Sequence, residues 1–315
     1  MTDSLHAYYA DQFVLPLPEG HRFPMHKYAR LRERLAAMPG IALQPAPAAT
    51  PGELALVHTP DYIQGVLQGP LDPAIAREIG FPWSPAMAER ACRSVGATIA
   101  AARDAMQHGL AGNLAGGTHH ARADRGGGFC VFNDLAVTAR LMQAEAFRQG
   151  RRLLRVAVID LDVHQGNGTA RIFARDDSVF TLSLHGEKNF PFRKEPSDLD
   201  VGLPDGCSDD AYLQALHQAL AELEGRFTPD MVIYLAGADA HEGDRLGRLK
   251  LTLDGMAARD RVVLDWAWQR RLPVAMCMGG GYGHDIETTV AVQVQTWTIA
   301  LEYQRRWQAR AGLRA

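Results

Sequence analysis

The chain has 315 residues, 47% of them hydrophobic, and its 33 basic and 36 acidic side chains leave a net charge of −3 at pH 7. This near-neutral balance gives no sign of a nucleic-acid partner or of attachment to an anionic membrane. The sequence lacks both the ~18 consecutive apolar residues of a membrane span and the start of a secretory signal. We therefore expect a cytoplasmic protein, whose oligomeric state the sequence does not indicate.

Cysteine usage and chain organisation agree with this expectation. The four cysteines form no CxxC pair, which argues against a thiolate zinc site, and we expect them to be reduced residues of the core. No linker rich in Pro, Ser or Gly and no internal repeat divides the sequence. We predict a single catalytic domain over residues 1–315, in which the N-terminal third is an addition to the core.

Helical periodicity and short apolar runs alternate along the chain. The helical pattern predicts helices over Pro85–His108, Asn133–Gln149, Asp209–Glu224, Thr252–Arg270 and Asp285–Trp307. The apolar runs predict buried strands at Asn113–Gly117, Arg155–Ile159, Val179–Leu184, Met231–Ala236 and Val274–Met278. This alternation favours an α/β fold, a single-domain three-layer αβα sandwich with a mainly parallel central sheet.

Polar or glycine-rich residues follow each predicted strand. In an open parallel sheet, functional residues gather beyond the carboxyl ends of the strands. In chain order the tips carry His119 and His120, then Asp160, Asp162 and His164, then His185, then Asp239, and finally Gly279–Tyr282. The sequence therefore predicts one shared cleft.

Alternate residues at the second tip suggest a metal site. Asp160, Asp162 and His164 can project from one face because side chains alternate along an extended chain. Asp162, His164 and Asp239 offer oxygen and nitrogen ligands and leave positions open, which is typical of a catalytic metal, with zinc as first choice and iron(II) as a substitute. Alternatively, the two aspartates of this tip cap the following helix and His164 packs beneath it.

A metal held by two carboxylates needs a separate base, because the carboxylates nearly cancel its charge and its bound water is less acidified. His119 and His120 can divide the removal and return of a proton. Tyr282, behind three glycines, can donate a hydrogen bond to an oxyanion. Phe129 and Phe190 can form apolar walls. Alternatively, the histidines lie in a surface loop and the aromatic residues anchor loops.

These motifs resemble those of the zinc-dependent histone deacetylase superfamily, which has the arginase/deacetylase fold. The resemblance runs from about residue 21 to about residue 298. It is carried by Gly117–His120, Arg125–Cys130, Asp160–Gly168, Ser183–His185, Ala236–Asp239 and Gly279–Tyr282. The details at Asp124–Gly126, Gln165–Gly168 and Glu242–Gly247 are most similar to the class IV branch and its bacterial relatives.

The resemblance implies roles for individual residues. Zinc is held by Asp162, His164 and Asp239, and the catalytic residues are His119, His120, Tyr282, Asp160 and Asn167. A structural K⁺ or Na⁺ ion is held by Asp160, Asp162, His164, Ser183 and Leu184, and a second monovalent cation lies near Phe173 and Val179. The substrate-binding site is lined by Gly128, Phe129, Phe190 and Gly281.

One position departs from the family pattern. Many members place an aspartate behind the second histidine, where this chain has Asn167. We hypothesise that Asp160 favours the charged form of His119, while His120 faces a neutral amide, stays neutral near pH 7 and acts as the general base. The two imidazoles are therefore expected to differ in protonation.

The expected reaction is hydrolysis of the amide between an acyl group, acetyl or longer, and the ε-amine of lysine in a protein or peptide. An acetylpolyamine amidohydrolase, acting on an acylated small amine, shares most of these residues but needs an acidic rim. A non-catalytic binder of acyl-lysine or of a metabolite is a further alternative. A dinuclear manganese hydrolase of the arginase type is disfavoured because Ala240 and His241 stand where it would need more carboxylates.

Overall fold

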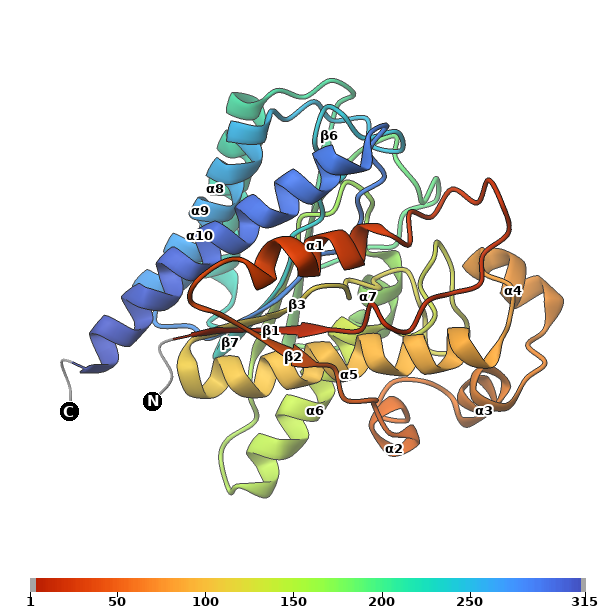
Figure 1. Ribbon diagram of the computed structural model, residues 1–315. Helices are drawn as coiled ribbons and strands as arrows, with labels where there is room; N and C mark the ends of the chain where they lie inside the picture. The colour runs from red at the N-terminus through yellow and green to blue at the C-terminus, as the bar shows by residue number, and fades with distance from the viewer. Residues whose placement is uncertain (1–3, 313–315) are drawn as a thin grey trace.

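The chain folds around an eight-stranded sheet, as seen in a computed structural model that describes residues 4–312 (Figure 1). All strand pairs are parallel, in the order β2-β1-β3-β8-β7-β4-β5-β6. The strands are β1 Leu5–Tyr9, β2 Ile41–Pro45, β3 Leu110–Asn113, β4 Val156–Asp160, β5 Val179–Gly186, β6 Leu199–Leu203, β7 Met231–Leu235 and β8 Val274–Cys277. The predicted α/β sandwich is confirmed, and its sheet is parallel throughout.

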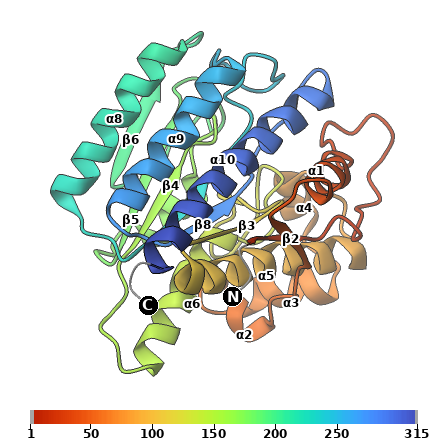
Figure 2. The same cartoon turned by 60° about the vertical axis from the view of Figure 1, so that its left-hand side comes forward.

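Helices cover both faces of this sheet. They are α1 Lys27–Ala36, α2 Pro51–Leu54, α3 Pro60–Gln68, α4 Pro73–Ile79, α5 Pro85–His108, α6 Asp134–Arg148, α7 Asn167–Phe173, α8 Asp209–Arg226, α9 Leu253–Gln269 and α10 Ile286–Gly312. Helices α8, α9, α10 and α1 lie on one face, and α5 and α6 lie on the other (Figures 1 and 2). None of the helices described is long and apolar enough to span a membrane.

Four of the five long helices were predicted to within two residues at each end, and the fifth, α10, ends five residues later than predicted. Helix α5 begins at Pro85, where the side chain of Ser84 accepts a hydrogen bond from the backbone N–H of Met87. It ends at Gly109, whose φ of +97° few other residues adopt. Local sequence therefore determines both ends of the longest helix on that face.

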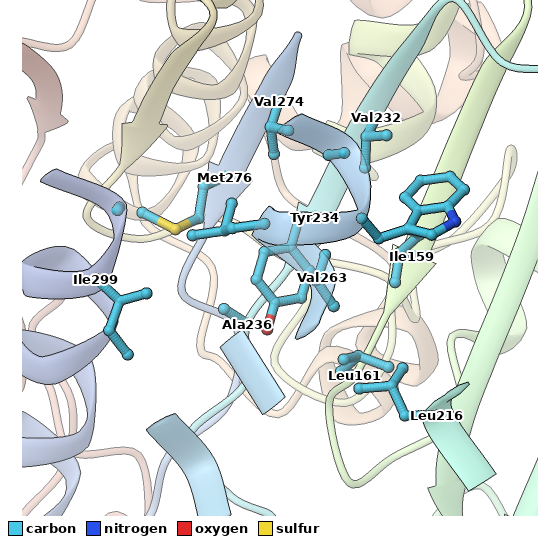
Figure 3. Packing of buried hydrophobic residues seen from close by; sticks show 14 of the residues in the cluster. Ile159, Leu161, Leu216, Val232, Tyr234, Ala236, Val263, Val274, Met276 and Ile299 are labelled. Atoms are coloured by element: carbon cyan, nitrogen blue, oxygen red, sulfur yellow. The ribbon is translucent and has the colours of Figure 1, made fainter. Parts of the chain in front are cut away.

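Two apolar cores lie on opposite faces of the sheet, because successive strand residues point to opposite sides. In β7, Val232 and Tyr234 pack in the core under α8, α9 and α10, whereas Met231 and Ile233 pack in the core under α5 and α6. Figure 3 shows the first core, with Tyr234 near Val263 of α9. Burial on both faces explains why the central strands have continuous apolar sequences.

The structure corrects two predictions. The strand expected at Asn113–Gly117 is β3, which ends at Asn113, because Gly116 and Gly117 have φ values of +75° and +73° that a strand does not allow. The N-terminal third is part of the sheet, since β1 pairs with β3 and its Leu5 is buried in the main core. The four cysteines are free and buried, as expected.

Candidate active site

Three adjacent strands place the predicted ligands at the carboxyl edge of the sheet. Asp160 is the last residue of β4, and Asp162 and His164 follow in the turn. Asp239 follows β7, which lies between β4 and β8, and Gly280 follows β8. Because these strands are parallel neighbours, residues separated by more than a hundred positions meet at one point.

Asp162, His164 and Asp239 form a buried cluster whose ligand atoms all lie within 4.8 Å of one another. His164 Nδ1 lies 2.9 Å from Asp162 Oδ1 and 3.2 Å from Asp239 Oδ2. The other carboxylate oxygens accept hydrogen bonds from the backbone, Asp162 Oδ2 from Gly280 N–H at 2.7 Å and Asp239 Oδ1 from Val163 N–H at 3.0 Å. The backbone thus fixes the orientation of both carboxylates.

The cluster has the properties of a cation site. Asp239 Oδ2 is buried and lacks a hydrogen-bond partner within residues 4–312, a costly arrangement unless another group binds the oxygen. Burial and the negative charge of the neighbouring Asp162 raise the pKa of Asp239 above its usual value. A Cβ atom on Gly280 would lie 1.8 Å from Asp239 Oδ2, so only glycine leaves the carboxylate its space. Two carboxylates and an imidazole around one buried point suit a divalent metal.

The two adjacent histidines are held by different partners. Their ring centroids are 4.1 Å apart. His119 Nδ1 lies 2.6 Å from Asp160 Oδ2, and His120 Nδ1 lies 2.7 Å from Asn167 Oδ1. The predicted difference between a carboxylate behind one ring and an amide behind the other is therefore present in the structure.

These partners separate the acid–base properties of the pair. Burial lowers the pKa of His119, but the charges of Asp160 and Asp162 outweigh burial and raise this pKa to about 9. Burial, with the neighbouring His119 and His164, lowers the pKa of His120 well below its usual value. The carboxylate beside His119 therefore favours its protonated form, and the buried surroundings of His120 favour its neutral form.

Tyr282 is almost fully buried beside the cluster, with its ring centroid 6.4 Å from that of His164. Its backbone N–H donates to Asp244 Oδ2 at 2.6 Å, and its carbonyl accepts from Arg245 Nε at 2.8 Å. Burial and the charges of Asp162 and Asp239 raise the pKa of the phenol well above its usual value. Tyr282 therefore remains a hydrogen-bond donor at neutral pH.

A pocket of about 450 Å³ opens onto this group. Phe129 and Phe190 line it together with Gly128, His120 and Tyr282. The ring centroid of Phe190 lies 4.9 Å from that of His120, edge-on. A Cβ atom on Gly128 would lie 2.5 Å from the His120 ring. The arrangement provides a passage with aromatic walls to a metal-type site beside His120 and Tyr282.

A family model for the histone deacetylase domain matches residues 21–298. The chain belongs to this family. It is 47% identical over 287 residues to an uncharacterized protein of Picosynechococcus sp., a match that covers 90% of this chain and 93% of the relative. With the buried Asp-His-Asp cluster, membership makes the chain a metal-dependent amidohydrolase of the histone deacetylase family.

Two solved structures of related proteins have a similar fold. An HDAC homologue from Aquifex aeolicus has a TM-score of 0.79 at 25% identity, over 94% of this chain and 84% of that one. An acetylpolyamine aminohydrolase from Burkholderia pseudomallei has a TM-score of 0.73 at 25% identity, over 95% of this chain and 98% of that one. A protein named as an HDAC homologue and one named as an acetylpolyamine aminohydrolase therefore have a fold similar to that of this chain.

The remaining residues predicted from the deacetylase resemblance lie in several places. Ser183 pairs with Asp160 across β4 and β5, and Leu184 follows it. Phe173 and Val179 lie at the other end of β5, around the turn from α7. The monovalent cation positions stay predictions. His185 and Gly281 are not among the residues that line the pocket. His185 lies within β5, and a Cβ atom on Gly281 would meet the side chain of Thr289.

Several residues that fix the backbone of the site by hydrogen bonds were not predicted from the sequence. Lys27 is fully buried, and its Nζ donates to the carbonyls of Gly279 at 3.4 Å and Gly281 at 3.2 Å. The same ammonium group lies 5.3 Å from the ring centroid of Tyr282. Asp134 accepts the backbone N–H of Gly117 at 3.0 Å and fixes the turn before the histidines. The Asp244 side chain was within reach of prediction, because it lies inside the quoted motif Glu242–Gly247.

Proposed function

We propose that the chain hydrolyses the amide bond of an acylated lysine ε-amine, using one divalent ion, zinc or iron(II), held by Asp162, His164 and Asp239. The observation that carries the proposal is the unequal pair, His119 on a carboxylate and His120 on an amide, beside this cluster. A site that only bound acyl-lysine would not need two histidines of opposite protonation state.

The chain's own residues account for the proton transfers. When bound, the metal supplies Lewis-acid polarisation of the scissile carbonyl. His120 takes a proton from the attacking water at Nε2, because its Nδ1 is bonded to Asn167. The phenol of Tyr282 donates a hydrogen bond to the developing oxyanion. Asp160 favours the protonated form of His119. His119 then supplies the proton that the leaving amine requires.

The pocket walls suit the neutral stem of acyl-lysine. Phe129 and Phe190 both line the passage, and each buried methylene of the stem contributes about 0.8 kcal/mol. Phe129 also lines a second cavity, together with Leu15, Phe81 and Met87, among others. Acyl groups of graded length therefore belong in the test of the substrate.

The proposal includes three further assignments. A K⁺ or Na⁺ ion beside Asp160, a class IV-like position within the family and a cytoplasmic location rest on the sequence motifs and composition. An acetylated polyamine is the second candidate substrate, supported by the aminohydrolase of similar fold. We favour acyl-lysine because an acidic rim, which would attract a polycation, is missing among the residues that line the pocket, where Glu78 is the one carboxylate.

Hydrolysis assays on the purified zinc-loaded and iron-loaded protein test the proposal. Peptides carrying acetyl-, butyryl-, octanoyl- and myristoyl-lysine are compared with acetylated spermidine, and His120→Ala is the inactive control. We expect hydrolysis of the acyl-lysine peptides with a higher kcat/KM than that of acetylated spermidine. Faster turnover of acetylated spermidine would favour the polyamine reaction, and hydroxamate binding without any hydrolysis would favour a binding protein.

A further inference from the structure

The mouth of the pocket is rich in cations. Arg22, Arg77, Lys188 and Arg248 line it, against the single carboxylate of Glu78. They come from the segment before α1, from α4, from the loop after β5 and from the segment before α9. The whole chain has a net charge of −3, so this local excess of positive charge does not follow from composition.

Three of these cations lack a neutralising partner. Arg248 pairs with Asp205 at 3.1 Å, and Glu78 lies 3.6 Å from Arg125, which offsets its charge. Within residues 4–312, no carboxylate oxygen lies within 4.0 Å of the charged nitrogens of Arg22, Arg77 or Lys188. All three side chains are exposed. They therefore remain able to pair with a ligand that brings negative charge to the mouth.

We propose that the enzyme selects acylated lysines flanked by Asp or Glu residues in an acidic peptide segment. This inference rests on the proposed amidohydrolase function. Charges of one sign around a pocket mouth raise the local concentration of oppositely charged ligands and repel like charges. The aromatic passage takes the uncharged acyl-lysine side chain, while Arg77 and Lys188 contact carboxylates of the neighbouring residues. A polycationic amine is repelled by the same groups.

Three peptides with one acetyl-lysine and flanks of Asp, Ser or Lys test this selectivity. At low ionic strength we expect kcat/KM for the Asp-flanked peptide to exceed that for the Lys-flanked peptide about tenfold or more. In 0.5 M salt the ratio falls towards one, because exposed charges are screened. The double substitution Arg77→Glu with Lys188→Glu is expected to reverse the order.

Arg151→Glu is the control for a remote charge reversal, because Arg151 is exposed and precedes β4, at the edge of the sheet opposite the pocket. It lowers the net charge by two units, against four for the double substitution, and should leave the peptide ratio unchanged. Equal turnover of all three peptides overturns the selectivity and leaves the proposed hydrolysis standing. If no peptide is hydrolysed, the proposed function fails, and fluorescence anisotropy of the labelled peptides then decides the preference. Equal dissociation constants overturn it, and tighter binding of the Asp-flanked peptide supports it.

Discussion

Within residues 4–312, two groups of His and Asp side chains have the spacing of metal ligands. One lies at the carboxyl ends of the strands and the other at their amino ends. The first is Asp162, His164 and Asp239 at the carboxyl edge. The second is His6 near the amino end of β1 with Asp104 and His108 in the last turn of α5. The first group has two carboxylates and one imidazole, the second has one carboxylate and two imidazoles, and the two groups also differ in burial.

The difference lies in how the carboxylate oxygens are satisfied. Asp104 Oδ2 is bonded to His6 Nδ1 and to the hydroxyl of Tyr8, both at 2.6 Å, and His108 is exposed. Asp239 Oδ2 is buried and lacks any hydrogen bond in the described chain. A partly exposed carboxylate oxygen with two donors is already satisfied, whereas a buried carboxylate oxygen without a hydrogen bond is costly unless a cation binds it. Ligand spacing alone does not make a metal site.

Removing one carboxylate from each group should have the largest and most unequal effects. Asp239→Asn deletes a ligand and is expected to reduce metal content and kcat/KM by on the order of 100-fold or more, since even substitutions behind a ligand cost 10–100-fold in affinity or activity. Asp104→Asn should leave one metal ion per chain and normal activity. Elemental analysis after dialysis against a trace of zinc measures both. Loss of metal from the Asp104 variant would invalidate the comparison.

A second pair of substitutions compares a tyrosine near the metal-type site with a tyrosine beside the other group. Tyr282→Phe removes the proposed oxyanion donor, and we expect kcat to fall by about 10²–10³ with little change in KM. Tyr8→Phe removes a hydrogen bond to Asp104 and should leave both constants unchanged. Steady-state kinetics on an acetyl-lysine peptide gives the result. Equal losses in kcat and binding affinity for Tyr282→Phe would indicate a structural role.

The group of Asp162, His164 and Asp239 could be predicted because its residues follow apolar runs, such as the one in Val156–Asp160, that are typical of buried strands. Strand β1 escaped prediction because His6, Tyr8 and Tyr9 interrupt its pattern, and its partners lie in β2 and β3, far along the chain. Lys27 escaped for another reason. A lysine is expected at the surface, and only the folded chain brings the glycine carbonyls and aromatic rings that accept its charge.

Lys27 offers a test of how far the backbone behind Tyr282 controls catalysis. Lys27→Met keeps much of the volume and removes the donor to Gly279 and Gly281, so the turn should hold Tyr282 less firmly. Because hydrogen bonds of charged groups contribute about 1.5–3 kcal/mol, we expect kcat to fall about tenfold or more. Lys27→Arg should recover part of the loss. A lower melting temperature with unchanged kcat would make Lys27 purely structural.

The smallest expected effect concerns the pH profile of the histidine pair. In Asn167→Asp, a carboxylate replaces the amide 2.7 Å from His120 Nδ1. The negative charge stabilises the imidazolium form, so the pKa of His120 rises from its lowered value and the base becomes protonated at a higher pH. The acidic limb of kcat/KM against pH should therefore move up by about one unit or more. An unmoved limb would exclude His120 as the group that must be neutral, and would leave His119, with its pKa raised by Asp160, as the residue to examine.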